Sequence, residues 1–232
     1  MKYLAFATDF DGTIARTGVV EVSTFAALQR LKNSGRKLIL ATGRDLGELR
    51  QVCPRLALFD RVVVENGALI YRPSDHSVIL LAGPPPASFL EALRKRAVSP
   101  MSVGRVIVAT WRPDETIVAE VIQSLGLDLQ IILNKRAVMV LPAGVDKATG
   151  LKAALKDLGI PAERTLAVGD GENDLTMLDA CGFSAVVANA VEDLKQKVDM
   201  VLTQDHGAGV AELITWLLKD EPSANPSPPA PE

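Results

Sequence analysis

The stretch Thr8-Asp9-Phe10-Asp11-Gly12-Thr13 places two carboxylates directly after the apolar run Tyr3-Leu4-Ala5-Phe6-Ala7. The apolar run is long enough for one buried strand, and the glycine marks a turn after it. Because side chains alternate along a strand, Asp9 and Asp11 are expected on one side, at the carboxyl end where open α/β sheets bind ligands. Two neighbouring carboxylates repel each other, so the pair requires a cation, a shared proton or a positively charged neighbour, and a divalent metal with a phosphate fits that need. The alternative is a polar strand end with an aspartate in the following turn.

The composition is that of a globular protein with one full core and a small second lobe. The chain has 232 residues, 48% hydrophobic and 23% charged, with a formal net charge of -3. No block of like charges is present, which argues against nucleic-acid partners and a membrane-binding surface. Cys53 and Cys181 lack the spacing of a metal site and are interpreted as free thiols of a cytoplasmic protein. We expect no membrane span, because no apolar run approaches the roughly 18 residues that one requires.

The amino-terminal third repeats a strand, a polar loop and a helix. We expect a helix over Glu21–Ser34, a strand over Arg36–Ala41, a helix over Asp45–Val52 and a strand over Val62–Val64 that ends in Glu65-Asn66-Gly67. This order predicts an α/β fold with a Rossmann-like, mainly parallel sheet.

The parallel order is interrupted after Ala68. Leu69–Tyr71 and Val78–Leu81 predict a hairpin, and Gly83-Pro84-Pro85-Pro86 is a stiff connector. We predict a small α/β cap domain at 84–141, inserted into a core domain formed by 1–83 and 142–220. Its expected elements are a helix through Phe89, Leu90 and Leu93, a strand over Arg105–Thr110, a helix over Pro113–Leu125, and strands over Leu129–Leu133 and Ala137–Leu141.

The strand and helix order resumes after the cap. Asp146 is expected to cap a helix whose first turn holds Lys147 and which ends at Gly159. The proline-rich residues 221–232 are expected to be a disordered extension. The remaining expected elements are strands over Thr165–Val168, Phe183–Val187 and Met200–Leu202, and helices over Leu175–Ala180, Val191–Val198 and Val210–Leu218.

Four loops carry reactive or anion-binding residues and converge at one edge of such a sheet. Phosphoryl transfer needs mostly positioning and charge neutralisation, which these residue types supply. Asp9 is the predicted nucleophile, and Asp11 the acid and base that serves the leaving alcohol and then the attacking water. Asp170 completes an oxygen-rich Mg²⁺ site. Thr42 and Lys147 are predicted to bind the phosphoryl group.

Other interpretations of single residues remain open at this point. Thr42 fits a helix cap, Lys147 a solvated lysine of a first helical turn, and Asp174 a partner of a helix dipole. Neither histidine is placed for catalysis, and we expect His76 and His206 in surface loops.

The motifs Asp9-Phe-Asp-Gly-Thr, Ala-Thr42-Gly-Arg, Lys147 and Gly-Asp170-Gly-Glu-Asn-Asp174 resemble, in order and spacing, those of the haloacid dehalogenase superfamily of phosphohydrolases. The insertion, Glu65-Asn66-Gly67-Ala68 and the Val-Asp-Lys147 run resemble its type IIB cap branch. That branch includes Cof-type sugar phosphatases and is similar to sucrose-phosphate phosphatases.

The resemblance implies a Mg²⁺-dependent phosphatase and assigns roles to matching residues. Asp9 and Asp11 are then catalytic, and Asp11 also offers its backbone carbonyl to the metal. Expected phosphate-binding residues are Gly12, Thr42, Gly43 and Lys147. Expected metal-site residues are Asp9, Asp11, Asp170, Asn173 and Asp174.

Substrate contacts cannot be carried over from the family, because Cof-type caps are often larger than residues 84–141. By position we predict that Arg44, Asn66, Arg112 and Asn134 contact a small phosphate ester, either a sugar phosphate or phosphoglycolate. The alternatives are a phosphomutase or phosphotransferase of the same fold and a non-catalytic regulatory binding protein. A monomer or a homodimer is expected.

Overall fold

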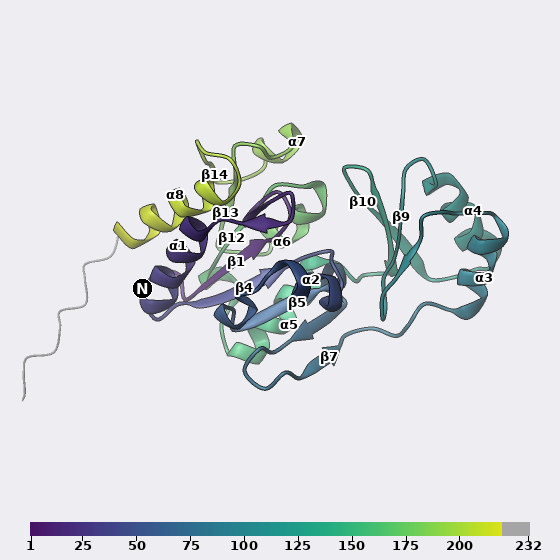
Figure 1. Ribbon diagram of the computed structural model, residues 1–232, viewed down its shortest axis with the longest axis horizontal. Coiled ribbons are helices and arrows are strands. Elements are labelled where there is room, and N and C mark those ends of the chain that lie inside the picture. Colours follow the sequence, from purple (N-terminus) through teal and green to yellow (C-terminus); the bar gives the residue numbers. More distant parts are fainter. Residues whose placement is uncertain (220–232) are drawn as a thin grey trace, which may run out of the picture.

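The computed structural model describes residues 1–219, which form two units that lie side by side (Figure 1). The larger unit contains an eight-stranded sheet of order β14-β13-β12-β1-β4-β5-β6-β7, and the smaller a four-stranded sheet of order β10-β11-β9-β8. The predicted fold class, a mainly parallel α/β sheet with an inserted small lobe, is therefore confirmed. The prediction for residues 221–232 lies outside the described residues.

The central strands end together at one edge of the large sheet. β1 (Ala5–Asp9) is buried throughout, because it pairs in parallel with β12 (Thr165–Gly169) on one side and β4 (Lys37–Ala41) on the other. The sheet is extended by parallel β5 (Arg61–Val64), β13 (Phe183–Val186) and β14 (Met200–Val201), and by the antiparallel hairpin of β6 (Leu69–Tyr71) and β7 (Val78–Leu80).

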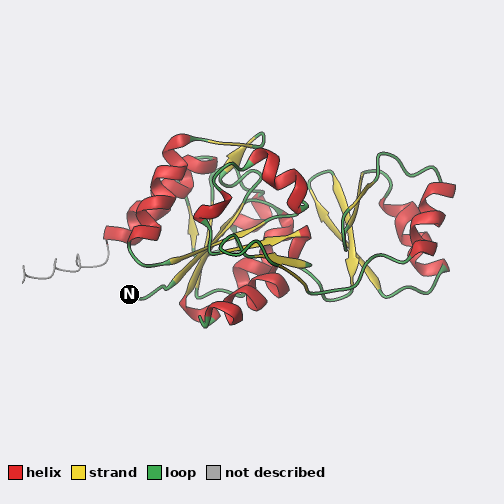
Figure 2. Cartoon of the chain, turned by 60° about the horizontal axis from the view of Figure 1, so that its bottom comes forward, coloured by secondary structure: helices red, strands yellow, loops and turns green. Residues whose placement is uncertain are grey.

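Helices cover both faces of this sheet (Figure 2). Alternate residues of β4 pack into two cores: Leu38 and Leu40 lie in one apolar cluster, and Ile39 lies in the other. The first face is covered by α1 (Val22–Asn33), α2 (Leu46–Val52) and α8 (His206–Lys219), and the second by α5 (Lys147–Leu158), α6 (Leu175–Asp179) and α7 (Glu192–Lys195). Single-turn helices are η1 (Leu56–Leu58), η2 (Glu65–Gly67), η3 (Ala162–Arg164) and η4 (Glu172–Asp174).

The small unit, here called the cap, has its own apolar core. Phe89, Leu93 and Val118 of its helices pack on Val138 and Val140 of its sheet. The sheet faces the large unit and the helices lie on the far side (Figure 1). The cap elements are α3 (Ala87–Lys95), β8 (Ser102–Val103), β9 (Val108–Trp111), α4 (Glu115–Ser124), β10 (Leu129–Asn134) and β11 (Ala137–Pro142).

The predicted strand over Arg105–Thr110 is wrong in its first half. Only β9, from Val108, is a strand, because the buried carboxylate of Glu65 accepts the backbone N–H groups of Arg105, Val106 and Ile107 at 3.0, 2.8 and 2.9 Å. These donors are therefore not available to a strand ladder. Glu65 thus ties the end of β5 to the cap, a contact that the sequence did not indicate.

Several further elements differ from the prediction. Helix α8 begins at His206 rather than Val210, and α7 covers less than the predicted 191–198. Residues after the first motif form an unpredicted hairpin of β2 (Ala15–Arg16) and β3 (Val19–Val20). The prediction of a loop position is wrong for His206, whose Nδ1 lies 2.8 Å from the carbonyl oxygen of Gly12.

Among residues 1–219, no helix is long and apolar enough to cross a membrane.

Candidate active site

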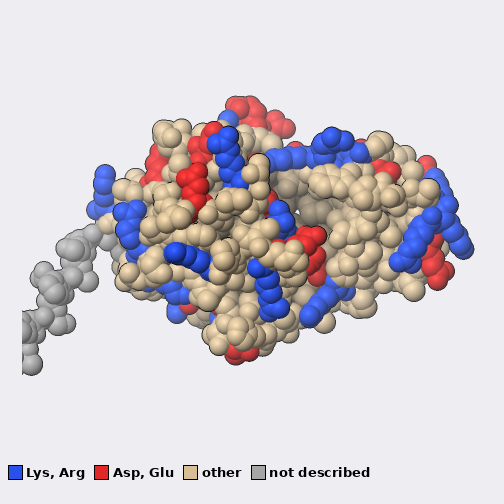
Figure 3. All heavy atoms as spheres, viewed as in Figure 1, with Lys and Arg blue, Asp and Glu red and all other residues tan. Residues whose placement is uncertain are grey.

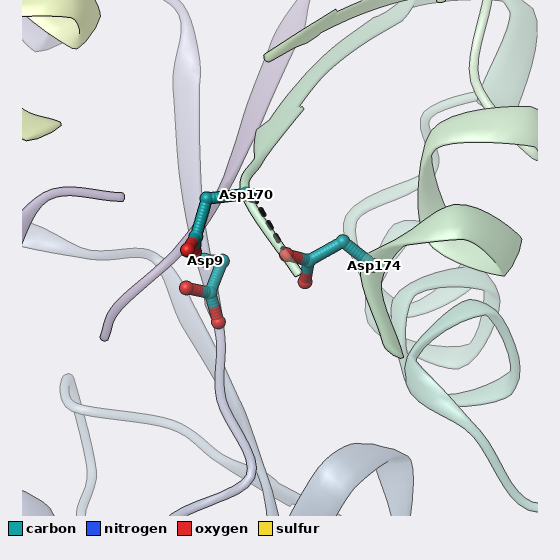
Figure 4. A group of neighbouring side chains, drawn as sticks. All are labelled: Asp9, Asp170 and Asp174. Atoms are coloured by element: carbon teal, nitrogen blue, oxygen red, sulfur yellow. Dashed lines mark hydrogen bonds between the residues drawn. The ribbon is translucent and has the colours of Figure 1, made fainter. Parts of the chain in front are cut away.

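Three buried carboxylates meet at the carboxyl edge of the large sheet. Oxygen atoms of Asp9, Asp170 and Asp174 lie within 4.8 Å of one another, and the side chains point toward a common space (Figure 4). The parallel pairing of β1 and β12 brings Asp9 and Asp170 together. Thr8 of β1 is opposite Val168 of β12, so both strands end at the same level. Three buried negative charges at this separation require compensating cations.

Lys147 supplies one of these cations. Its Nζ donates to Asp9 Oδ1 at 2.5 Å and to Asp174 Oδ1 at 2.6 Å, and the side chain is 1% exposed. Asp146 caps α5 by accepting from Thr149 N at 2.8 Å, as predicted, which places Lys147 in the first turn. Burial alone would lower the pKa of Lys147, but Asp174 and Asp9 outweigh burial and raise it. The interpretation as a solvated lysine is therefore wrong.

The carboxylates remain under-compensated. Burial raises the pKa of Asp9 well above its ordinary value despite Lys147, and the charges of Asp174 and Asp170 add to the shift. Burial, followed by Asp174, likewise raises the pKa of Asp170. Ionising all three carboxylates is therefore costly even beside Lys147, which favours a further cation.

Asp174 orients the loop that follows β12. Its Oδ2 accepts from the backbone N–H groups of Asp170 and Gly171, both at 2.9 Å, while its Oδ1 is bonded to Lys147. Asp170 Oδ1 accepts from Thr13 Oγ1 at 3.0 Å. These bonds fix both carboxylates, so Asp174 does more than balance a helix dipole.

Two observations indicate that the cluster fits a divalent cation. Asn173 Oδ1 is buried without a hydrogen-bond partner, whereas its Nδ2 donates to Asn66 Oδ1 at 2.9 Å. A buried amide oxygen is costly when unpaired and is a hard ligand of the kind that Mg²⁺ and Ca²⁺ prefer. Gly12, at φ +91°, lies so close to Asp170 that a Cβ would overlap its carboxylate, so the backbone of the first motif approaches the cluster.

Asp11 lies outside this cluster. Strand β1 ends at Asp9, so the expected alternation does not continue, and Asp11 turns toward Arg44. The guanidinium donates from Nε to Oδ2 at 2.6 Å and from Nη2 to Oδ1 at 2.8 Å, and the Asp11 side chain is 43% exposed. In the structure Arg44 therefore holds Asp11, the predicted acid and base, at the open side of the site.

Thr42 and Gly43 follow β4, beside the nucleophile candidate, because Ala41 pairs with Asp9. Thr42 Oγ1 accepts from Arg44 N at 3.1 Å. Asp45 caps α2 by accepting from Glu48 N at 2.9 Å, so the interpretation of Thr42 as the helix cap is wrong. The backbone N–H of Gly12 donates to Ala15 O at 2.9 Å, and so it is already engaged.

The predicted substrate residues separate into two groups. Asn66 is buried at the site with an unpartnered Nδ2, and Asn134 packs so closely on Gly171 that a Cβ there would clash with its Oδ1. Arg112 instead pairs within the cap, where its Nε lies 3.9 Å from Glu115 Oε1. No described contact joins Arg112 to the acidic cluster. Figure 3 shows a hollow between the core and the cap. A cavity of about 270 Å³ is bordered by Gly43 of the core and Trp111 of the cap.

Sequence reasoning missed three residues at the site. Lys135, in the turn between β10 and β11, donates from Nζ to Asp170 Oδ2 at 2.6 Å. Asn189 Nδ2 donates to Gly12 O at 2.9 Å, beside the contact from His206. These contacts join residues far apart in sequence and belong to no motif. The only available signal was a lysine in a cap turn.

The comparisons place the chain among known proteins. The sequence model of haloacid dehalogenase-like hydrolases matches residues 6–93 and 114–214. A phosphoglycolate phosphatase of Methanopyrus kandleri is 30% identical over 225 residues, which cover 92% of this chain and 96% of the relative. One of Methanothermobacter thermautotrophicus is 29% identical over 216 residues, covering 90% of this chain and 96% of the relative.

Solved structures support the same fold. A haloacid dehalogenase-like hydrolase from Bacteroides thetaiotaomicron has a TM-score of 0.79 at 20% identity, with 93% of this chain and 99% of that chain covered. A sugar phosphatase of subclass IIB has a TM-score of 0.77 at 22% identity, with 92% and 98% covered. Both alignments extend over the core and the cap.

Proposed function

This chain belongs to the haloacid dehalogenase-like hydrolase family, and we propose that it is a Mg²⁺-dependent phosphatase that hydrolyses small phosphate monoesters through an aspartyl-phosphate on Asp9. The observation that carries the proposal is the buried Asp9 carboxylate at a strand end, 2.5 Å from the Lys147 ammonium and grouped with Asp170 and Asp174. A nucleophile, a fixed positive charge and an oxygen-rich metal site are the parts that phosphoryl transfer needs.

The reaction proceeds in two displacements. The Asp9 carboxylate attacks phosphorus, the bond to the ester oxygen breaks, and the departing alcohol takes a proton from Asp11. Water then attacks the phosphorus of the aspartyl-phosphate and gives its proton to Asp11, which releases phosphate and restores Asp9. Asp11 must exchange its bonds to Arg44 for the leaving oxygen, and its 43% exposed side chain has room to turn.

The groups around Asp9 bind the transferred phosphoryl group. Lys147 offsets the charge that gathers on the phosphoryl oxygens, and Thr42 offers a hydroxyl from the neighbouring strand. Gly43 and the unpartnered Nδ2 of Asn66 add donors. Gly12 contributes by letting the loop approach Asp170, since its own N–H is engaged with Ala15.

The carboxylates of Asp9 and Asp170 and the backbone carbonyl of Asp11 would hold Mg²⁺, while Asn173 and Asp174 support that site. When bound, the ion neutralises charge on the phosphoryl group and orients it for in-line attack. The grouping of three buried carboxylates and the unpartnered Asn173 oxygen support this assignment.

The substrate proposal is a small ester, either phosphoglycolate or a sugar phosphate. The relatives named phosphoglycolate phosphatase support the first, and the fold neighbour named a subclass IIB sugar phosphatase supports the second. We further propose that residues 84–141 act as the cap domain on a core of 1–83 and 142–220, and that the enzyme is a cytoplasmic monomer or homodimer. Light scattering tests the oligomeric state, and cell fractionation tests the cytoplasmic location.

The test measures phosphate release from p-nitrophenyl phosphate and 2-phosphoglycolate after chelation and after Mg²⁺ addition. The wild type should require Mg²⁺, and Asp9→Asn should lose about 10³-fold or more in kcat, because the residues act as a unit. Equal release by both proteins would rule out Asp9 as the nucleophile.

A further inference from the structure

The tip of the β10–β11 hairpin in the cap touches the core at the acidic cluster. Lys135 has φ 54° in this turn, and its backbone N–H donates to Glu172 Oε2 at 3.1 Å. Asn134, the residue before it, packs on Gly171 of the loop after β12. The cap therefore presents this turn directly to the loop that carries Asp170.

The ammonium of Lys135 reaches the cluster from the open side. Its Nζ donates to Asp170 Oδ2 at 2.6 Å, yet the Lys135 side chain is 50% exposed whereas that of Asp170 is 2% exposed. Lys147, by contrast, is 1% exposed and lies between two carboxylates. A half-exposed lysine can leave its partner at a much lower desolvation cost than a buried one.

A metal ion and Lys135 compete for the same atom. Asp170 Oδ1 accepts from Thr13 Oγ1, and Oδ2 accepts from the Lys135 ammonium, so a metal ion that ligates Oδ2 would meet that ammonium. A divalent ion on this oxygen and the ammonium would repel each other, and this repulsion is stronger in a buried site than in water. A metal ion bound at Asp170 would therefore displace this half-exposed ammonium.

We propose that Lys135, once released, binds a carboxylate on the leaving group of the substrate and so makes the enzyme selective for short phosphorylated acids. This inference rests on the proposed function and deepens it. An ammonium held at a half-buried position favours an anionic partner over a neutral hydroxyl. The unpartnered Oδ1 of Asn134 lies beside it as an acceptor for a hydroxyl or for the ammonium itself.

Proximity limits the size of the leaving group. Asp9 and Lys147, which we propose to bind the phosphoryl group, are in direct contact, and Lys135 contacts Asp170 of the same cluster. A carboxylate reached by Lys135 is therefore separated from the phosphate by a short chain of a few atoms.

The experiment compares 2-phosphoglycolate with ethyl phosphate, an ester of the same length without the carboxylate. In saturating Mg²⁺, Lys135→Met should lower kcat/KM for 2-phosphoglycolate by about 10- to 100-fold, mainly through KM, because a charge-assisted bond to the substrate is lost. Ethyl phosphate should change by less than about threefold, since the phosphate site is intact. Arg136→Met removes the same charge from the next residue, which has no described contact with Asp170, and should leave the preference unchanged.

A second readout does not use activity. Calorimetric titration of the metal-free protein with Mg²⁺ should show binding about 3- to 10-fold tighter for Lys135→Met than for the wild type, because the competing ammonium at Asp170 is gone. Arg136→Met should show a smaller change.

Several results would overturn the inference. These are an equal loss for both esters, an unchanged rate for 2-phosphoglycolate, the same selectivity change in Arg136→Met, and an unchanged Mg²⁺ affinity in Lys135→Met. Failure of the proposed function looks different, because the wild type would then hydrolyse neither ester.

Discussion

Lys147 and Lys135 bind the same acidic cluster in two different ways. Lys147 is 1% exposed, starts α5 and bridges Asp9 and Asp174, all within the core unit. Lys135 is 50% exposed, lies in a cap turn and contacts only Asp170 in the cluster. Lys147 is therefore part of the folded framework of the site, whereas Lys135 makes a contact between the two units that can be removed.

The largest effect is expected from Lys147→Met. Two buried carboxylates lose their partner, so the free energy of unfolding should fall by about 3 to 5 kcal/mol. Activity should fall by about 10³-fold or more, since the phosphoryl group loses its fixed cation. Urea denaturation and p-nitrophenyl phosphate turnover measure the two effects. An unchanged free energy of unfolding in Lys147→Met would show that Lys147 does not stabilise the folded core.

Glu65→Ala should have the next largest effect, because it removes the acceptor of three backbone N–H groups at the junction with the cap. We expect a loss of about 2 kcal/mol and faster amide exchange at 105–107. Glu65→Gln keeps an acceptor oxygen and serves as the matched control, with a smaller loss. Identical amide exchange at residues 105–107 in the wild type and Glu65→Ala would show that Glu65 does not hold this segment.

Asp9→Asn should stabilise the metal-free protein at neutral pH. The folded-state pKa of Asp9 is raised, so the folded state binds more protons than the unfolded state above the ordinary pKa. Stability is therefore lost as pH rises through this window, and the asparagine variant escapes that loss. Its Tm should exceed that of the wild type by about 2 to 4 °C near pH 8, the shift given by about 1 kcal/mol. The difference should vanish near pH 4, and a gap that widens at low pH would contradict the sign.

The smallest effect on stability is expected from Lys135→Met. Its single ion pair is half exposed, so the free energy of unfolding should change by less than about 0.5 kcal/mol. Thermal unfolding of the metal-free protein checks this value beside Lys147→Met. A loss similar to that of Lys147→Met would erase the distinction between a framework lysine and a removable one.

The framework of the site was predictable from sequence because it follows from sheet geometry. Asp9 ends β1 and Asp170 follows β12, and parallel strands align their carboxyl ends. Lys147 was predictable because Asp146 caps its helix. Local patterns of this kind need no knowledge of tertiary contacts.

The remaining parts depended on contacts between distant residues. Asp11 departs from strand alternation because β1 ends at Asp9 and Arg44 holds its carboxylate. The donors before Val108 are taken by Glu65, which shortens a strand that looked continuous. Lys135 reaches Asp170 only because the hairpin tip of the cap lies on the core. No periodicity or local motif encodes such pairings.

Transfer of the phosphoryl group to Asp9 is best tested by rapid acid quench and peptide mass spectrometry. Asp11→Asn should be mixed with p-nitrophenyl phosphate and Mg²⁺, because nitrophenolate leaves without an acid whereas water attack lacks its base. We predict a burst of nitrophenolate and one phosphoryl group on the peptide at Asp9. A burst with the phosphoryl group on another residue, or steady turnover with none at Asp9, would rule out Asp9 as the nucleophile.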